Sequence, residues 1–318
     1  MPDRPLVVLD CDPGHDDALA MVVAARFCDL AGVTTVAGNA PLSRTTYNAR
    51  VMRELLGVDV EVHAGAARPL VAEAHAAASI HGASGLDGAD LPAPSRPVDS
   101  EDAVRFIVDT CRRNEGVTIV ATGPLTNVAL ALRAAPDLAG RIAGISIMGG
   151  GSFGNRTPVA EFNIWADPEA AAIVFHTAAA GELGGPLTMA GLDVTHRFQA
   201  TPDRIAAVDA IGGLLARTLA DLLRFFSSAY EGRHDPGTMA GAAMHDPLAV
   251  LALTHPHLFT VAERHVTVET AWGASTRGMT VIDERTLVER AAPNARVLVD
   301  VDADGAFAVL VDAVASFS

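Results

Sequence analysis

The stretch PLVVLDCDPGHDDALAMVVAARF, residues 5–27, decides the fold. Residues 5–10 form a short apolar run that is typical of a buried strand, and apolar residues at helical spacing follow over 16–27. Pro13 and Gly14 supply a tight turn between the two. A strand that leads directly into a helix is the building unit of a parallel sheet.

The same alternation continues along the chain. We expect further strands at 32–38, 60–65, 117–122 and 142–150, and helices at 43–57, 100–114, 125–135 and 167–178. Ser100 and Asp167 are the expected N-caps of two of these helices. A mostly helical region follows at about 201–255, and then strand-like runs at 264–270, 277–283 and 295–301 precede a last helix. The chain therefore predicts one α/β domain, 1–318, with an open, mainly parallel sheet flanked by helices and an active site at the carboxyl ends of the strands.

Charge and composition exclude several classes of partner. The formal net charge is −15, from 23 basic and 38 acidic residues, which argues against nucleic acid or an anionic membrane but not against an uncharged nucleoside. No run approaches the length of a membrane span, and the N-terminal residues lack the features of a secretory signal. Cys11, Cys28 and Cys111 match no disulfide framework or zinc site, so we expect buried free thiols in a cytoplasmic protein.

Four aspartates crowd into eight positions after the first strand: Asp10, Asp12, Asp16 and Asp17. Helix capping accounts for Asp16 and Asp17 but not for Asp12, and mutual repulsion at this density is costly unless a cation or a proton relieves it. Carboxylate oxygens favour a hard cation, Ca²⁺ or Mg²⁺. An EF-hand loop is excluded, because its twelfth position would be Met21 or Val23 instead of Glu.

Two other enzyme classes share part of this pattern. A D-x-D phosphotransferase would use Asp10 as its nucleophile, but that class commonly needs a downstream lysine, and this chain contains no lysine. GGGSFG, residues 149–154, formally matches G-x-G-x-x-G, yet Pro158 follows where a dinucleotide site needs a helix.

Further polar residues follow the later strands or lie in loops near them. Asn39 ends one strand, and Asn155, Glu161 and Asn163 share one loop, where amide and carboxylate side chains suit the hydroxyls of a sugar. Two His-Asp-Pro triplets occur, at 234–236 and 245–247. We favour His245 and Asp246 over His234 and Asp235, because Pro247 is placed to begin a helix. His81 lies in SIHGASGLDG, whose composition suits a flexible lid within the long loop 72–98.

Taken together, these motifs resemble the nucleoside hydrolases of the inosine–uridine-preferring type. The resemblance covers essentially the whole chain and is carried by DCDPGHDDA (10–18), GN (38–39), HGASGLDG (81–88), ATGPLTN (121–127), MGGG (148–151), AEFN (160–163), GLDVTH (191–196) and HDP (245–247). It implies a homodimeric or homotetrameric enzyme that hydrolyses the N-glycosidic bond of purine or pyrimidine ribonucleosides to free base and ribose. The alternative that the residues leave open is a non-catalytic ribose- or nucleoside-binding protein of the same fold.

The resemblance also implies a role for each matching position. One Ca²⁺ would be held by Asp12, Asp17, Asp246 and the backbone carbonyl of Thr122, and Asp12 would activate a calcium-bound water as general base. The transition state would resemble an oxocarbenium ion, and His245 would protonate the leaving base. The remaining substrate-binding positions would be Asp16, Asn39, His81, Met148, Asn155, Glu161, Asn163 and Tyr230.

Overall fold

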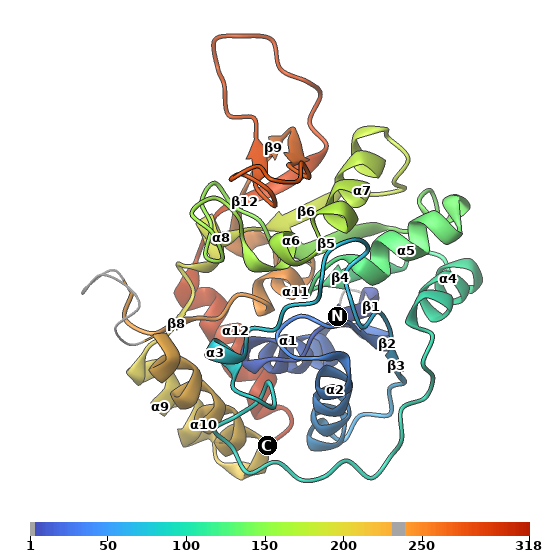
Figure 1. Cartoon of the computed structure of the whole chain (residues 1–318). Helices are drawn as coiled ribbons and strands as arrows, with labels where there is room; N and C mark the ends of the chain where they lie inside the picture. The colour runs from blue at the N-terminus through green and yellow to red at the C-terminus, as the bar shows by residue number, and fades with distance from the viewer. Residues whose placement is uncertain (1–3, 231–238) are drawn as a thin grey trace.

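The central feature of the computed structural model is an eight-stranded sheet in the order β3-β2-β1-β4-β5-β6-β12-β9 (Figure 1). The structure describes residues 4–230 and 239–318. The strands are β1 (Leu6–Cys11), β2 (Asp29–Thr35), β3 (Val62–Ala64), β4 (Thr118–Ala121), β5 (Gly144–Met148), β6 (Leu187–Ala190), β9 (Phe259–Arg264) and β12 (Ala295–Val301). Only β9 runs antiparallel to its neighbour, so the predicted α/β fold with an open, mainly parallel sheet is confirmed.

Helices cover both faces of the sheet (Figure 1). One face carries α1 (His15–Phe27), α2 (Leu42–Leu56), α9 (Pro202–Ile211), α10 (Gly213–Tyr230), α11 (Pro247–Thr254) and α12 (Ala303–Ala315), and the other carries α4 (Ala103–Arg113), α5 (Thr126–Ala134) and α7 (Pro168–Ala179). Strand β1 contributes Val7 and Leu9 to the first core and Val8 to the second, as the alternation of side chains along a strand requires. Two apolar cores therefore hold the sheet from both sides.

The remaining elements are shorter. They are the helices α3 (Ala78–His81), α6 (Phe162–Ala166) and α8 (Leu192–Thr195), the paired strands β7 (Gln199–Ala200) and β8 (Ala242–Ala243), the paired strands β10 (Val266–Val268) and β11 (Thr280–Ile282), and 3₁₀ turns at Pro136–Leu138 and Pro256–Leu258. Strand β9 was not predicted from the sequence. The long loop predicted at 72–98 is present and contains only α3 as regular structure. No helix among the described residues has the length and apolar character needed to cross a membrane.

One predicted helix start was wrong. Helix α4 begins after Asp102, whose carboxylate accepts a hydrogen bond from the backbone N–H of Arg105 at 3.0 Å. Ser100 instead pairs with His63 beside β3, and its hydroxyl lies 2.8 Å from Nδ1 of that histidine. Pairing with a distant strand therefore took Ser100 away from the cap position. The other predicted cap, Asp167, is confirmed at α7.

The strand order places a binding site at one point on the sheet edge. Strands β2 and β4 lie on either side of β1, so the chain winds outward in both directions from the boundary between β1 and β4. Ligands of open α/β sheets bind at the carboxyl ends of the strands at such a switch point. Asp12 follows β1 and Thr122 follows β4, which puts both residues at this position.

Candidate active site

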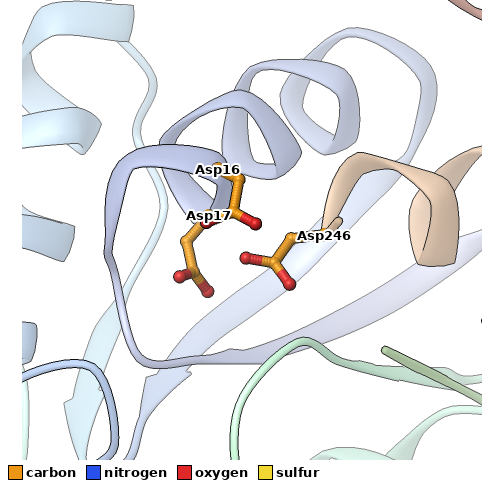
Figure 2. Close-up of side chains that lie close together, drawn as sticks. All are labelled: Asp16, Asp17 and Asp246. Carbon is orange, nitrogen blue, oxygen red and sulfur yellow. The ribbon is translucent and has the colours of Figure 1, made fainter. Parts of the chain in front are cut away.

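Three carboxylates from two distant segments converge at the switch point. Asp16 and Asp17 lie in the first turn of α1, and Asp246 immediately precedes α11; Figure 2 shows their side chains close together. One oxygen of each carboxylate lies within 4.8 Å of the others, and all three residues are buried. This separation suits oxygen atoms that share one cation.

Asp12 is buried beside them and is incompletely satisfied. Its Oδ2 accepts a hydrogen bond from the backbone N–H of Asn39 at 2.6 Å, but its Oδ1 has no partner among the described residues. The surrounding backbone comes very close, because a Cβ on Gly38 would lie 2.0 Å from Oδ2 and one on Gly123 would lie 2.5 Å from Oδ1. The two glycines therefore leave just enough room for this carboxylate, and its free oxygen needs a cation, a proton or a water.

Asp17, in contrast, has hydrogen-bond donors on both of its carboxylate oxygens. Its Oδ1 accepts hydrogen bonds from the Thr122 hydroxyl at 2.8 Å and from the Asp12 N–H at 3.3 Å. Its Oδ2 accepts bonds from the Gly14 N–H at 2.9 Å and from the Asn39 amide at 3.0 Å. Four donors from three segments of the chain therefore fix the position of this carboxylate.

The electrostatics of the cluster call for a positive charge. Burial raises the pKa of Asp12, Asp16 and Asp246 above the usual range of aspartate. The next cause is a neighbouring carboxylate in each case: Asp17 for Asp12 and Asp16, and Asp16 for Asp246. Because each carboxylate disfavours ionisation of the others, a divalent cation among them would relieve the repulsion. The donor set, all oxygen, and the unpartnered Oδ1 of Asp12 fit a hard cation such as Ca²⁺.

Asp10 lies one step further from the cluster. Its Oδ1 accepts hydrogen bonds from the Thr34 hydroxyl at 2.6 Å and from the Asn127 amide at 2.8 Å, whereas its Oδ2 has no partner in the described part of the chain. Burial raises the pKa of this carboxyl to about 6 despite these two bonds. Asp10 therefore links β1 to β2 and α5 beneath the site.

A cavity of about 510 Å³ opens above the carboxylates. Of the residues predicted to act at the site, those that line it are Asp16, Asn39, His81, Thr122, Met148, Asn155, Glu161, Asn163, Tyr230, His245 and Asp246. Asp12 and Asp17 are buried at its base and are not among the lining residues. The volume is in the range of small-molecule pockets.

The amide side chains of this cavity are oriented by the backbone. Asn163 donates its NH₂ to the carbonyl oxygens of Thr122 at 2.7 Å and Met148 at 3.2 Å, which leaves its Oδ1 for a hydroxyl donor. Glu161 caps α6, with its carboxylate accepting the N–H groups of Gly150, Asn163 and Ile164. Burial nevertheless raises the pKa of Glu161.

Comparison with known proteins gives one consistent match. The family model described as inosine-uridine preferring nucleoside hydrolase matches residues 7–308. The pyrimidine-specific ribonucleoside hydrolase RihA of Enterobacter sp. (strain 638) is 44% identical over 317 residues, 98% of each chain. RihA of Salmonella typhimurium (strain LT2) is 45% identical over 304 residues, 94% of each chain. The solved structure of a purine-preferring ribonucleoside hydrolase from Gardnerella vaginalis superposes with a TM-score of 0.89 at 31% identity, covering 98% of each chain.

The chain belongs to the nucleoside hydrolase family. The resemblance seen in the sequence is thereby confirmed, and so is the enzyme class, because the relatives are named ribonucleoside hydrolases, which are N-glycosidases.

Two of the predicted site residues that line the hydrolase cavity are histidines, His81 and His245. Nδ1 of His245 lies 2.7 Å from the Thr195 hydroxyl, and its Nε2 lies 3.3 Å from the hydroxyl of Tyr230. Burial, together with the neighbouring His196, lowers the pKa of His245 to about 3, so the ring is neutral at pH 7. Burial likewise keeps the pKa of His81 well below its ordinary value.

Sequence reasoning missed two polar residues that line the cavity, Arg156 and His196. His196 ends the GLDVTH motif, which was the one signal that pointed to it. Phe226 also lines the cavity, although it is almost fully buried. His234 and Asp235, the triplet that was not favoured, lie outside the described residues.

Proposed function

We propose that this nucleoside hydrolase uses Ca²⁺ and Asp12 to hydrolyse ribonucleosides to free base and ribose, and that pyrimidine nucleosides are its preferred substrates. The observation that carries the proposal is the unpartnered Oδ1 of Asp12, buried beside Asp16, Asp17 and Asp246 below a cavity of about 510 Å³. The preference for pyrimidines is supported by the names of relatives that are 44–45% identical over nearly the whole chain.

Asp12, Asp17 and Asp246, with the carbonyl of Thr122, are the residues that would hold the metal ion. When bound, Ca²⁺ would supply Lewis-acid chemistry, lowering the pKa of a water molecule and orienting the vicinal hydroxyls of the ribose. Asp16 is also within reach of the cluster, with its Oδ2 accepting a hydrogen bond from the backbone N–H of His245 at 3.1 Å. That bond fixes the Asp16 carboxylate beside the ribose diol.

The chemistry divides between the two sides of the cavity. Oδ1 of Asp12 takes a proton from the water whose oxygen bonds to C1′, while the C1′–N bond breaks with its electron pair leaving on the base. The anionic base then takes up a proton from solvent, and Asp12 returns its proton to solvent, which completes the hydrolysis. Positive charge develops on the ribose in the transition state, and the surrounding carboxylates stabilise it. Oδ1 of Asn163 and the Glu161 carboxylate accept hydrogen bonds from sugar hydroxyls. Asn155, which also lines the cavity, binds the sugar with them.

His245 faces the departing base in this proposal. Because its ring is neutral at pH 7, it acts as a hydrogen-bond donor to the base through its single N–H, and not as an imidazolium. Tyr230, whose hydroxyl lies 3.3 Å from Nε2 of His245, connects the ring to the cavity.

The test is hydrolysis of uridine, cytidine, inosine and adenosine, followed as release of reducing sugar. We expect turnover with a higher kcat/KM for the two pyrimidine nucleosides, loss of activity in chelator, and recovery on addition of Ca²⁺. Absence of ribose from all four substrates would refute the hydrolase mechanism. Undiminished activity after complete metal removal would refute the role of calcium alone, and a higher kcat/KM for inosine would refute the pyrimidine preference.

Two expectations from the sequence stay predictions. Cytoplasmic location is testable by cell fractionation. Assembly into a homodimer or homotetramer is testable by light scattering of the purified chain.

A further inference from the structure

His15 is a buried residue that does not line the cavity itself but contacts two side chains that do, His81 and Phe226. It stands at the first position of α1 and is fully buried, while His81 and Asp87 approach it from α3 and the turn that follows. It does not line the cavity, and neither the proposed metal site nor the proposed chemistry uses it. Its two ring nitrogens nevertheless contact both of those segments.

The first contact fixes the proton on the His15 ring. Nε2 of His15 lies 2.8 Å from the backbone carbonyl oxygen of Asp87, which only accepts hydrogen bonds, so Nε2 carries a proton. The ring stacks on Phe225 and Phe226, with centroids 5.3 and 5.2 Å away and interplanar angles of 9° and 0°. A second ring proton would place a cation in the protein interior, on a fully buried ring, which is costly. Nδ1 of His15 is therefore a bare acceptor.

The second contact determines which ring nitrogen of His81 carries a proton. The two Nδ1 atoms of His15 and His81 lie 3.1 Å apart, and because that of His15 accepts, that of His81 must donate. The backbone N–H of His15 also points at Nδ1 of His81, at 3.4 Å, but a protonated ring nitrogen cannot accept it. The two contacts exclude each other, and we take the shorter one, between the rings, as the bond that forms. With its proton on Nδ1, His81 has a bare Nε2, for which the described part of the chain provides no hydrogen-bond donor, and the ring lines the cavity.

The turn that carries the Asp87 carbonyl is held in place by hydrogen bonds of its own. The carboxylate of Asp87 accepts the N–H groups of Ala83 and Ser84, at 2.9 and 3.1 Å, which closes the turn and fixes the Asp87 carbonyl. On the other side, the His81 ring packs directly on Gly14, where a Cβ would lie 2.6 Å from Nδ1. Little freedom remains for His81 to rotate away from His15.

We propose that His15 is a positioning residue that holds His81 in its Nδ1–H form, so that His81 offers Nε2 as an acceptor to an N–H or O–H group of the bound nucleoside. The identity of this ligand rests on the proposed function. The protonation pattern of His81 does not, and it can be measured in the absence of any substrate.

The direct test is NMR of the protein with ¹⁵N-labelled histidine, using His81→Phe to assign the His81 signals. In the wild type we expect a protonated Nδ1 and a bare Nε2 on His81. His15→Phe keeps an aromatic ring between the phenylalanines but lacks both nitrogens, so the His81 proton should move toward Nε2. His15→Asn places an amide oxygen where Nδ1 stands, and should restore the wild-type pattern.

A matched control is His63→Phe. His63 is also buried and stacks on a phenylalanine, Phe106, at 3.8 Å between centroids, with Nδ1 bonded to Ser100, but it lies outside the cavity. This variant should leave the His81 signals unchanged, so it separates a general loss of stability from the specific effect. A bare Nδ1 on His81 in the wild type would overturn the proposal even if every His15 variant failed to fold.

Kinetics give a second, independent readout. Loss of one hydrogen bond to the bound substrate corresponds to a rise of roughly tenfold in KM for uridine, with little change in kcat. We expect that rise in His15→Phe and its reversal in His15→Asn. The double variant His15→Phe/His81→Phe should be no worse than His81→Phe alone, because both changes remove the same bond. Independent, multiplying losses would overturn the proposal, whereas a wild type without any hydrolase activity would refute the proposed function and leave the NMR result standing.

Discussion

Asp10→Asn should change how the stability of the metal-free enzyme depends on pH. The buried carboxyl of Asp10 has its pKa raised from 3.8 to about 6, because burial outweighs the hydrogen bonds from Asn127 and Thr34. An acid whose pKa is higher in the folded protein stabilises the fold while protonated, so its contribution is fully present below pH 3.8 and is lost as the pH rises through 6. At 1.36 kcal/mol per pKa unit, the loss is about 3 kcal/mol.

The variant isolates this contribution. Asparagine is neutral at every pH, and its amide oxygen can keep both bonds that Oδ1 of Asp10 makes, while its NH₂ replaces the unpartnered Oδ2 at a cost that does not vary with pH. The free energy of unfolding of the wild type relative to Asp10→Asn should therefore fall by about 2.5 kcal/mol between pH 4 and pH 7.5.

Urea unfolding in chelator, at intervals of half a pH unit, measures the difference. Asp302→Asn is the matched control, because Asp302 is an exposed N-cap of α12 whose oxygen accepts the Gly305 N–H at 3.0 Å. Its curve should stay parallel to that of the wild type over this pH range. Parallel curves for the wild type and Asp10→Asn would refute the argument that burial dominates the Asp10 site.

Three further predictions concern activity. Asp12→Asn should lower kcat by roughly 10³-fold while circular dichroism stays that of the wild type, and retention of a tenth of the activity would exclude Asp12 as the base. His245→Ala should reduce hydrolysis of inosine more than that of uridine, since a purine offers a basic ring nitrogen to the donor; an equal loss with p-nitrophenyl riboside, whose leaving group needs no proton, would contradict this role. Gly14→Ala should lower kcat/KM by about 10²-fold, because the new Cβ would lie 2.6 Å from His81 Nδ1 and 2.8 Å from Asn39 Nδ2. Wild-type kinetics in Gly14→Ala would show that neither contact positions the substrate.

The local patterns of apolar residues predicted the architecture well, because each strand and the helix that follows it lie within one short segment of the sequence. Burial on both faces produces the apolar runs of β1 and β4, and the helices between them show their own spacing. Strand β9 was missed for the converse reason: it is the antiparallel edge strand of the sheet, only partly buried, and its burial pattern lacks the apolar run of a central strand. Ser100 shows the same limit, since its partner His63 comes from a strand that precedes it by 37 residues.

The sequence by itself determined the family, the α/β fold and most of the side chains that meet at the sheet edge, because parallel strands bring their carboxyl ends together whatever the details of packing. It could not decide how equivalent aspartates differ. Asp17 accepts four hydrogen bonds, whereas Asp12 keeps a free oxygen, and the donors and the facing carboxylate come from Asn39, Thr122 and Asp246. Hydrogen-bond partners so far apart in the chain are set only when the tertiary structure closes around them. For the same reason only the fold could reveal that His15, inside the most recognisable motif of the chain, contacts His81 and the turn beyond it.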